Sequence, residues 1–166
     1  KGLKELKEAL HLLVAVNENF TLKLVGDIDN GNPRSASQSW LKESFNSLNS
    51  EWIGYKEDIV SVFEKIDVVV LPSYYPEGIP HCLIEALAAS KPIITTDMPG
   101  CREVIENNGI MIPSGDSKAL FNAMLEMIKT DKLEEWSLKS FQLATKFDIN
   151  KINRKTLLVY GKINEV

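Results

Sequence analysis

Cysteine and histidine are scarce in this sequence. Only Cys82, Cys101, His11 and His81 occur among the 166 residues, and the two cysteines form no CxxC pair. This spacing excludes the common zinc-ligand patterns. With so little cysteine, the expected setting is reduced and cytoplasmic.

Long apolar runs and an excess of positive charge are lacking too. No run approaches the roughly 20 apolar residues of a membrane span, and no signal peptide is recognised, although Lys1 resembles a cut within a longer chain. The 19 basic and 23 acidic side chains give a net charge of -4. This balance argues against nucleic acid as a main partner, because binding to a phosphate backbone normally needs a basic surface.

What is present is the composition of an ordinary globular domain, with 44% hydrophobic and 25% charged residues. No repeat or low-complexity linker divides the chain, so residues 1–166 are expected to form one domain. Short β-type runs alternate with helical patterns, and three helices are expected after residue 116. The expected strands are residues 21–25, 51–54, 67–71, 92–96 and 109–112.

This alternation predicts an α/β fold, a Rossmann-like three-layer α/β/α domain with a parallel sheet of about five to six strands, plus C-terminal helices. The apolar run 67–71 is typical of a strand buried on both faces. In such sheets ligands bind where the loops leave the carboxyl ends of the strands.

One of those loops joins strand 67–71 to an expected helix at 80–89. A helix beginning at Pro80 would present the amides of His81, Cys82 and Leu83, together with the positive end of its dipole, to an anion such as phosphate. Gly78 would let the chain approach a ligand without a side chain in the way.

Two carboxylates flank this predicted anion site. Glu77 could accept hydrogen bonds from hydroxyls on a group attached to the phosphate. Glu85 could hold both hydroxyls of a vicinal diol such as a ribose, as the acidic residue of dinucleotide folds does. The alternative is structural, with Glu77 capping the helix and Glu85 in a helix salt bridge. The ligand that matches the first interpretation is a sugar nucleotide.

The frame Pro-Ser-x-x-x-Glu-Gly-x-Pro-x-x-x-x-Glu-Ala, which contains Glu77 and Glu85, resembles the signature of the family-four (group 1) retaining glycosyltransferases. The segments at residues 95–103 and 109–113 resemble the next segments of that family, and the likeness extends from Lys1 to about Leu125. It implies the GT-B fold, with two Rossmann-like domains across a cleft, and residues 1–166 as the C-terminal, donor-binding domain. The N-terminal acceptor domain would be absent from this sequence.

The resemblance implies a role for each matching residue. Glu77 would contact the donor sugar as the catalytic candidate, and Glu85 would contact the ribose. Tyr55 falls where the family's backbone meets the base, and Lys1-Gly2 resembles a Lys-Gly pair whose lysine binds the diphosphate. The donor-binding candidates are Lys1, Tyr55, Gly78, Ile79, His81, Cys82, Leu83 and Glu85.

The same resemblance implies a metal-independent retaining transfer with no cofactor beyond the nucleotide-sugar donor. The segment Pro99-Gly100-Cys101-Arg102-Glu103 resembles family members that build bacterial surface polysaccharide, mostly from UDP-sugars. The acceptor would be a saccharide or lipid-linked saccharide bound through the missing domain, and peripheral membrane contact of the full-length enzyme stays open. The alternatives are a nucleotide-sugar epimerase of the same fold and a non-catalytic nucleotide-sugar binding domain.

Other residues have simpler interpretations. The Asp27-x-Asp29 pair mimics a metal motif, but its Asn and Gly neighbours favour a turn. His81 and Cys82 are adjacent on a helix and do not face each other, which argues against a catalytic pair. Cys101 is expected to pack as a small apolar residue. Tyr74 and Tyr75 are candidates either for stacking on a ligand or for half-buried loop positions.

Overall fold

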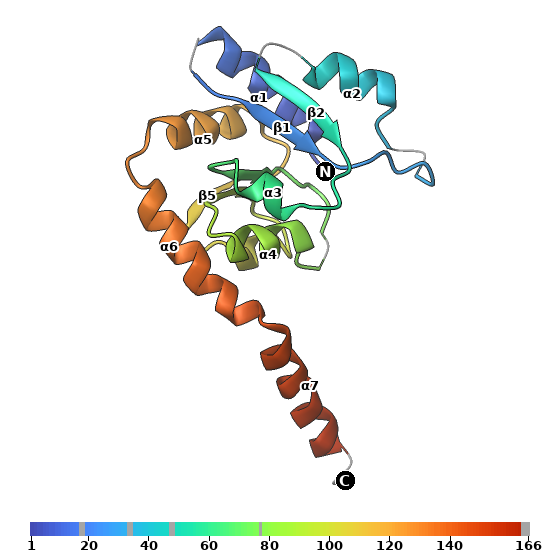
Figure 1. Ribbon diagram of the computed structural model, residues 1–166, viewed down its shortest axis with the longest axis vertical. Coiled ribbons are helices and arrows are strands. Elements are labelled where there is room, and N and C mark those ends of the chain that lie inside the picture. The colour runs from blue at the N-terminus through green and yellow to red at the C-terminus, as the bar shows by residue number, and fades with distance from the viewer. Residues whose placement is uncertain (17–18, 33–34, 47–48, 77, 164–166) are drawn as a thin grey trace.

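The computed structural model describes residues 1–16, 19–32, 35–46, 49–76 and 78–163. Glu77 therefore lies outside the described residues. Strands and helices alternate along the first two thirds of the chain, as predicted, and helices follow (Figure 1). The elements are α1 (Leu3–Ala15), β1 (Leu22–Val25), α2 (Gln38–Phe45), β2 (Ser50–Gly54), α3 (Val60–Phe63), β3 (Val69–Leu71), α4 (His81–Ala88), β4 (Ile93–Thr96), η1 (Arg102–Val104), β5 (Gly109–Ile112), α5 (Ser117–Lys129), α6 (Leu133–Ala144), η2 (Thr145–Phe147) and α7 (Ile149–Ile163).

The strand pairing is parallel throughout the described residues, which confirms the predicted α/β class. β1 pairs with β2, and β3, β4 and β5 pair in that order. The expected single sheet of five to six strands is divided, because β1 and β3 are not paired with each other. A cavity of about 670 Å³ lies between these two strands, where the sheet is divided.

Two hydrophobic clusters cover the opposite faces of the sheet strands, which confirms the three-layer arrangement. Neighbouring residues of β4 belong to different clusters, because successive side chains of a strand point to opposite faces. Ile94 packs in a cluster with α1, α2 and α5, whereas Ile93 packs in one with α3, α4 and η1.

The burial of β3 differs from the prediction for residues 67–71. All four residues of β4 are buried, and Ile93 and Ile94 are at most 1% exposed. The three residues of β3 are only partly buried, although apolar side chains lie on both of its faces. β3 is less buried than predicted because one of its edges lies along the cavity.

The helix α4 ends at a serine in a left-handed conformation. Ser90 has φ 58°, its amide donates to Leu87 O (2.9 Å), and the Lys91 amide donates to Ala86 O (2.8 Å). These two bonds form a Schellman motif, which glycine normally closes because it has no Cβ. A serine at this position makes the helix end hard to predict from sequence, because glycine is the residue that usually closes such a turn.

Replacing Ser90 with glycine is expected to stabilise the protein. Removing the Cβ from a left-handed position should raise the free energy of unfolding by about 1 kcal/mol. Asn107→Gly is a matched control, because Asn107 has φ 59° but asparagine tolerates this conformation better. Urea denaturation should show a gain for Ser90→Gly and a smaller one for Asn107→Gly; equal gains would refute the assignment of strain to Ser90.

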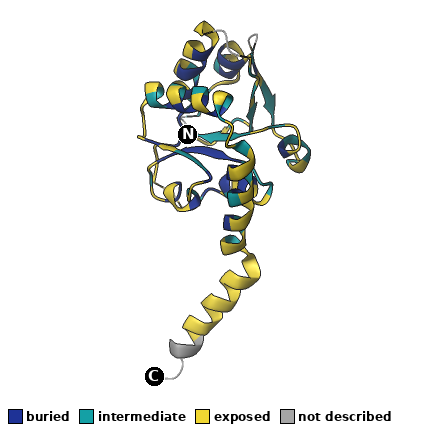
Figure 2. Cartoon of the chain, turned by 90° about the vertical axis from the view of Figure 1, so that its left-hand side faces the viewer, coloured by how far each residue is buried: buried dark blue, intermediate teal, exposed yellow. Residues whose placement is uncertain are grey.

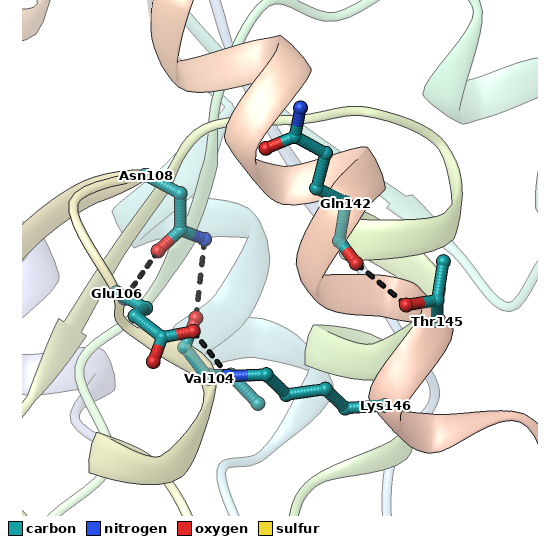
Figure 3. Close-up of polar contacts among 6 residues, drawn as sticks. All are labelled: Val104, Glu106, Asn108, Gln142, Thr145 and Lys146. Atoms are coloured by element: carbon teal, nitrogen blue, oxygen red, sulfur yellow. Dashed lines mark hydrogen bonds and ion pairs between the residues drawn. The ribbon is translucent and has the colours of Figure 1, made fainter.

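The C-terminal helices α5, α6 and α7 match the three that were predicted. The side chain of Asn108, which precedes β5, connects this region to α6 by donating to Ser140 Oγ (3.2 Å). Its contacts with Val104 and Glu106 are shown in Figure 3. Beyond η2, α7 extends away from the rest of the chain and its described side chains are exposed (Figures 1 and 2). Among the described residues, no helix combines the length and the apolar character needed to cross a membrane.

Candidate functional site

The carboxyl ends of the strands meet the start of α4 at one side of the domain. Two threonines of β4 fix the beginning of the β3–α4 loop to this edge. Thr95 Oγ1 donates to Leu71 O (2.8 Å), and Thr96 Oγ1 donates to Ser73 O. Ser73 is fully buried, so the loop departs from a rigid position.

The helix α4 begins at His81, one residue later than predicted, with Pro80 as its N-cap residue at φ −61°. No described side chain caps this end. The amide of Leu83 donates to Pro80 O (3.0 Å), and its side chain is fully buried in the core. The amides predicted to bind an anion are thus not equivalent, because that of Leu83 already has an acceptor.

Glu85 lies on the exposed side of α4. No hydrogen bond or ion pair of its carboxylate is found among the described residues. The structural alternative, a salt bridge along the helix, is therefore not supported for Glu85. Glu77, the catalytic candidate, lies outside the described residues.

Gly78 meets the steric requirement of a ligand-contacting position. A Cβ built there would have no described protein atom within 4 Å outside the adjacent residues, and its φ lies outside the left-handed region. The fold itself does not require glycine at this position. Ile79, the next residue, packs partly into the core beside α4.

Lys1 lies at the same edge as α4. Lys1, Pro72 and Cys82 all line the cavity between β1 and β3, together with Gly26 and Asp27, which follow β1. Glycine at position 2 allows the backbone to pass this close to Pro72, because a Cβ at Gly2 would lie 1.9 Å from Pro72 O. The predicted donor-binding residues Lys1 and Cys82, 81 positions apart in sequence, thus line the same cavity.

The remaining candidates lie around this edge. Tyr55 directly follows β2, and its side chain is 69% exposed. Tyr74 and Tyr75 are also exposed and contact each other, with ring centroids 4.6 Å apart. Cys101 is fully buried, which confirms its predicted packing role.

The Asp27 region forms the predicted turn. Asp27 Oδ1 accepts a hydrogen bond from the Ile28 amide (2.8 Å), and the Asn32 amide donates to Asp29 O (3.1 Å). In the described part of the chain, no group of three or more His, Cys, Asp or Glu side chains is placed to hold a metal ion.

The sequence analysis missed one ion pair at the next loop. Arg102 Nε lies 3.0 Å from Asp97 Oδ1, and Arg102 Nη2 donates to Asp97 O (3.1 Å). Both side chains are about half exposed. This pair stabilises the turn between β4 and η1. The sequence signal for it was an acidic residue at the end of a strand, Asp97, with a basic residue, Arg102, five positions later.

The chain is similar in sequence to known glycosyltransferases. The family model described as "Glycosyl transferases group 1" matches residues 1–139. A Campylobacter jejuni protein named N,N'-diacetylbacillosaminyl-diphospho-undecaprenol alpha-1,3-N-acetylgalactosaminyltransferase is 32% identical over 166 residues, covering 98% of this chain and 42% of that protein. A capsular polysaccharide biosynthesis glycosyltransferase of Staphylococcus aureus is 28% identical over 81% of this chain and 35% of its own length.

Solved structures agree in fold. A glycosyltransferase of Rickettsia africae superimposes with a TM-score of 0.84 at 25% identity, covering 98% of this chain and 44% of that one. The Anabaena protein HepE in complex with UDP has a TM-score of 0.79 at 24% identity, over 98% of this chain and 45% of its own. The chain spans less than half the length of these relatives. With a family model that covers most of its residues, the chain belongs to the group 1 glycosyl transferases.

Proposed function

We propose that this chain is the C-terminal, donor-binding domain of a two-domain retaining glycosyltransferase with the GT-B fold. The observation that carries the proposal is that Lys1 and Cys82, at the start of α4, line the same cavity at the carboxyl edge. A cationic side chain and a helix N-terminus both attract a diphosphate. Because the relatives are more than twice as long, the acceptor site is assigned to another part of the protein.

The donor would extend along the carboxyl edge. Its diphosphate would contact Lys1 and the amides of His81 and Cys82, with Gly78 leaving room for its approach. The exposed carboxylate of Glu85 would accept hydrogen bonds from the ribose diol. The base would lie toward Tyr55, and the sugar hydroxyls toward Glu77.

The proposed reaction transfers the sugar with retention of configuration. The acceptor hydroxyl attacks the anomeric carbon on the face from which the diphosphate departs, and the diphosphate takes up the proton of that hydroxyl. In this chain, Lys1 and the dipole of α4 would stabilise the negative charge that develops on the leaving diphosphate. No metal ion or further cofactor is required in this scheme.

The proposed donor is a UDP-sugar, and the proposed acceptor is a lipid-linked saccharide. UDP-sugars are supported by the HepE complexes with UDP and UDP-glucose. A lipid-linked saccharide acceptor, and with it surface polysaccharide synthesis, is supported by relatives whose names include undecaprenol-linked saccharides and capsular polysaccharide. The full-length enzyme would then work at the cytoplasmic side of a membrane.

The helix α7 supports peripheral contact with such a membrane. Exposed Ile149 and Ile152 lie on one side of α7, as helical spacing requires, and Lys151, Arg154 and Lys155 lie on another. Apolar and basic faces on one helix are typical of segments that rest on an anionic lipid surface.

Glu85→Ala is expected to weaken nucleotide binding by roughly 10- to 150-fold, because losing a hydrogen bond to a charged group costs about 1.5–3 kcal/mol. Glu134→Ala is a matched control, since Glu134 is exposed on α6 and outside the site. Calorimetry with UDP on the full-length protein measures the effect. Unchanged affinity in Glu85→Ala would contradict the proposed ribose contact.

Gly78→Val tests the diphosphate position separately. Because the Cβ at Gly78 meets open space, the melting temperature of the variant should stay close to that of the parent. Binding of the nucleotide should fall at least tenfold, because a branched side chain would occupy the approach to the start of α4. A variant that binds UDP normally would exclude the diphosphate from this position.

A further inference from the structure

The β3–α4 loop and the β4–η1 loop begin at neighbouring positions of the carboxyl edge. Thr96 Oγ1 donates to Ser73 O, and this bond joins the end of β4 to the start of the β3–α4 loop. Tyr74 directly follows Ser73, and Asp97 directly follows Thr96. An aromatic pair on the first loop and an ion pair on the second therefore start from the two ends of one hydrogen bond.

The aromatic pair is formed by Tyr74 and Tyr75. Their ring centroids lie 4.6 Å apart, with an angle of 38° between the planes, and both side chains are exposed. Tyrosine combines a flat apolar ring with a hydroxyl that donates and accepts hydrogen bonds. A sugar ring matches this combination, because it has an apolar C–H face and a rim of hydroxyls.

The ion pair of Asp97 and Arg102 is held in a fixed turn. The Asp97 amide donates to Ile112 O (2.9 Å), and the Arg102 amide donates to Met98 O (3.0 Å). Both side chains of the pair are about half exposed, and Arg102 uses only its Nε and Nη2 groups on Asp97. Within the described part of the chain, the guanidinium has no further partner.

The chemistry of this ion pair favours a neutral polar ligand. Its two charges oppose each other, so an anion gains little from Arg102 while Asp97 lies beside it. The pair instead presents N–H donors next to carboxylate acceptors. Adjacent hydroxyls of a sugar each donate and accept, so they can use both kinds of group at once.

Both pairs lie near the sugar end of the proposed donor. The diphosphate is assigned to the amides of His81 and Cys82, with Gly78 leaving room for its approach. Tyr75 precedes Gly78 by three residues, which corresponds to at most about 10 Å of extended chain. The acceptor has to come to this end of the donor, because its hydroxyl attacks the anomeric carbon.

We propose that Tyr74, Tyr75 and the Asp97–Arg102 pair contact the saccharide of the acceptor. The tyrosine rings would stack on a sugar face, and the ion pair would exchange hydrogen bonds with its hydroxyls. The donor domain would thus supply one wall of the acceptor site and take part in selecting the acceptor sugar. This inference rests on the proposed function.

The test is an NMR titration of the full-length protein with glucose, galactose, N-acetylglucosamine and N-acetylgalactosamine, each with and without saturating UDP. At least one sugar should shift the amides of Tyr74 and Tyr75 and the Nε–H signal of Arg102. The amide of Asn108, at the amino end of β5, should not move. Because sugar binding is read at this surface directly, failure of UDP to bind would contradict the donor role alone.

Variants then assign the contacts. Tyr75→Leu should weaken the affinity for that sugar by about two- to tenfold, the usual contribution of an aromatic contact. Arg102→Gln should weaken it by at least about tenfold, because hydrogen bonds from a charged group are lost. Tyr160→Leu on α7 is the matched control, since Tyr160 is exposed but lies away from this edge (Figure 1). Affinity for UDP should be unchanged in all three variants.

Three results would overturn the proposal. If no sugar shifts these signals with or without UDP, the surface is not a saccharide site. If Tyr75→Leu and Arg102→Gln bind the sugar as the parent does, the two side chains only stabilise their loops. If these variants instead lose affinity for UDP-glucose but not for UDP, and bind the free sugar normally, the contacts belong to the donor sugar.

Discussion

Gly2→Ala is expected to lower the free energy of unfolding by about 2–4 kcal/mol. Gly2 has φ 76°, which costs a residue with a Cβ about 1–2 kcal/mol. Its Cβ would also lie 1.9 Å from Pro72 O, and overpacking of this kind costs roughly 1–3 kcal/mol. The chain cannot easily shift, because Gly2 is buried and its carbonyl accepts the Leu6 amide (3.0 Å).

Gly115→Ala is the matched control for this substitution. Gly115 has the same φ of 76°, but a Cβ there would meet no atom within 4 Å outside the adjacent residues. Urea denaturation of the full-length protein should therefore show the larger loss for Gly2→Ala. The difference between the two variants measures the contact with Pro72, and nucleotide affinity should fall only in Gly2→Ala, because Lys1 is displaced. Equal losses of stability would show that Gly2 is not held against Pro72.

Asn108→Leu is expected to lower the free energy of unfolding by about 2–4 kcal/mol. The Asn108 side chain is fully buried; its Nδ2 donates to Val104 O (3.1 Å), and its Oδ1 accepts from the Glu106 amide (2.6 Å) (Figure 3). Asn108 Nδ2 also donates to Ser140 Oγ of α6 (3.2 Å). Leucine has a similar size but leaves Val104 O and the Glu106 amide without these partners, at about 1–3 kcal/mol for each that stays buried, whereas Ser140 Oγ still donates to Lys91 O (2.8 Å).

The neighbouring ion pair supplies the control. Lys146 pairs with Glu106 in the same view, and both side chains are more than half exposed (Figure 3). Lys146→Ala should cost no more than about 1 kcal/mol, because exposed ion pairs contribute little. Chemical denaturation of both variants gives the comparison. An Asn108→Leu variant within about 0.5 kcal/mol of the parent would mean that the network does not hold α6 in place.

Much of the fold follows from local patterns in the sequence. Short apolar runs separated by helical patterns predicted the parallel strands, and the residues of β4 and β5 lie where those runs are. The division between β1 and β3 could not be predicted in this way. Strand pairing depends on which segments lie alongside each other in three dimensions, and a cavity lies between β1 and β3. The partial burial of β3 follows from the same cavity, which lies along its edge.

The candidate site was predictable in part, because its residues lie in one contiguous loop and helix. The apolar pattern placed the start of α4 within one residue. It could not show that the Leu83 amide donates to Pro80 O, or that Lys1 and Cys82 line the same cavity. Both depend on the path of the backbone in three dimensions. The Ser90 turn was also hard to predict, because serine, unlike glycine, rarely adopts a left-handed conformation.

The donor-binding role is tested most directly by an NMR titration of the full-length protein with UDP, GDP and ADP. The account predicts that at least one nucleotide binds, with shifts of the amides of Gly78 and His81 at the start of α4 and of Tyr55 after β2, the proposed donor contacts. The amides of Asn108 and Ser140, in the network that holds α6, should stay unchanged. Failure of all three nucleotides to bind, or shifts centred away from the start of α4, would contradict it.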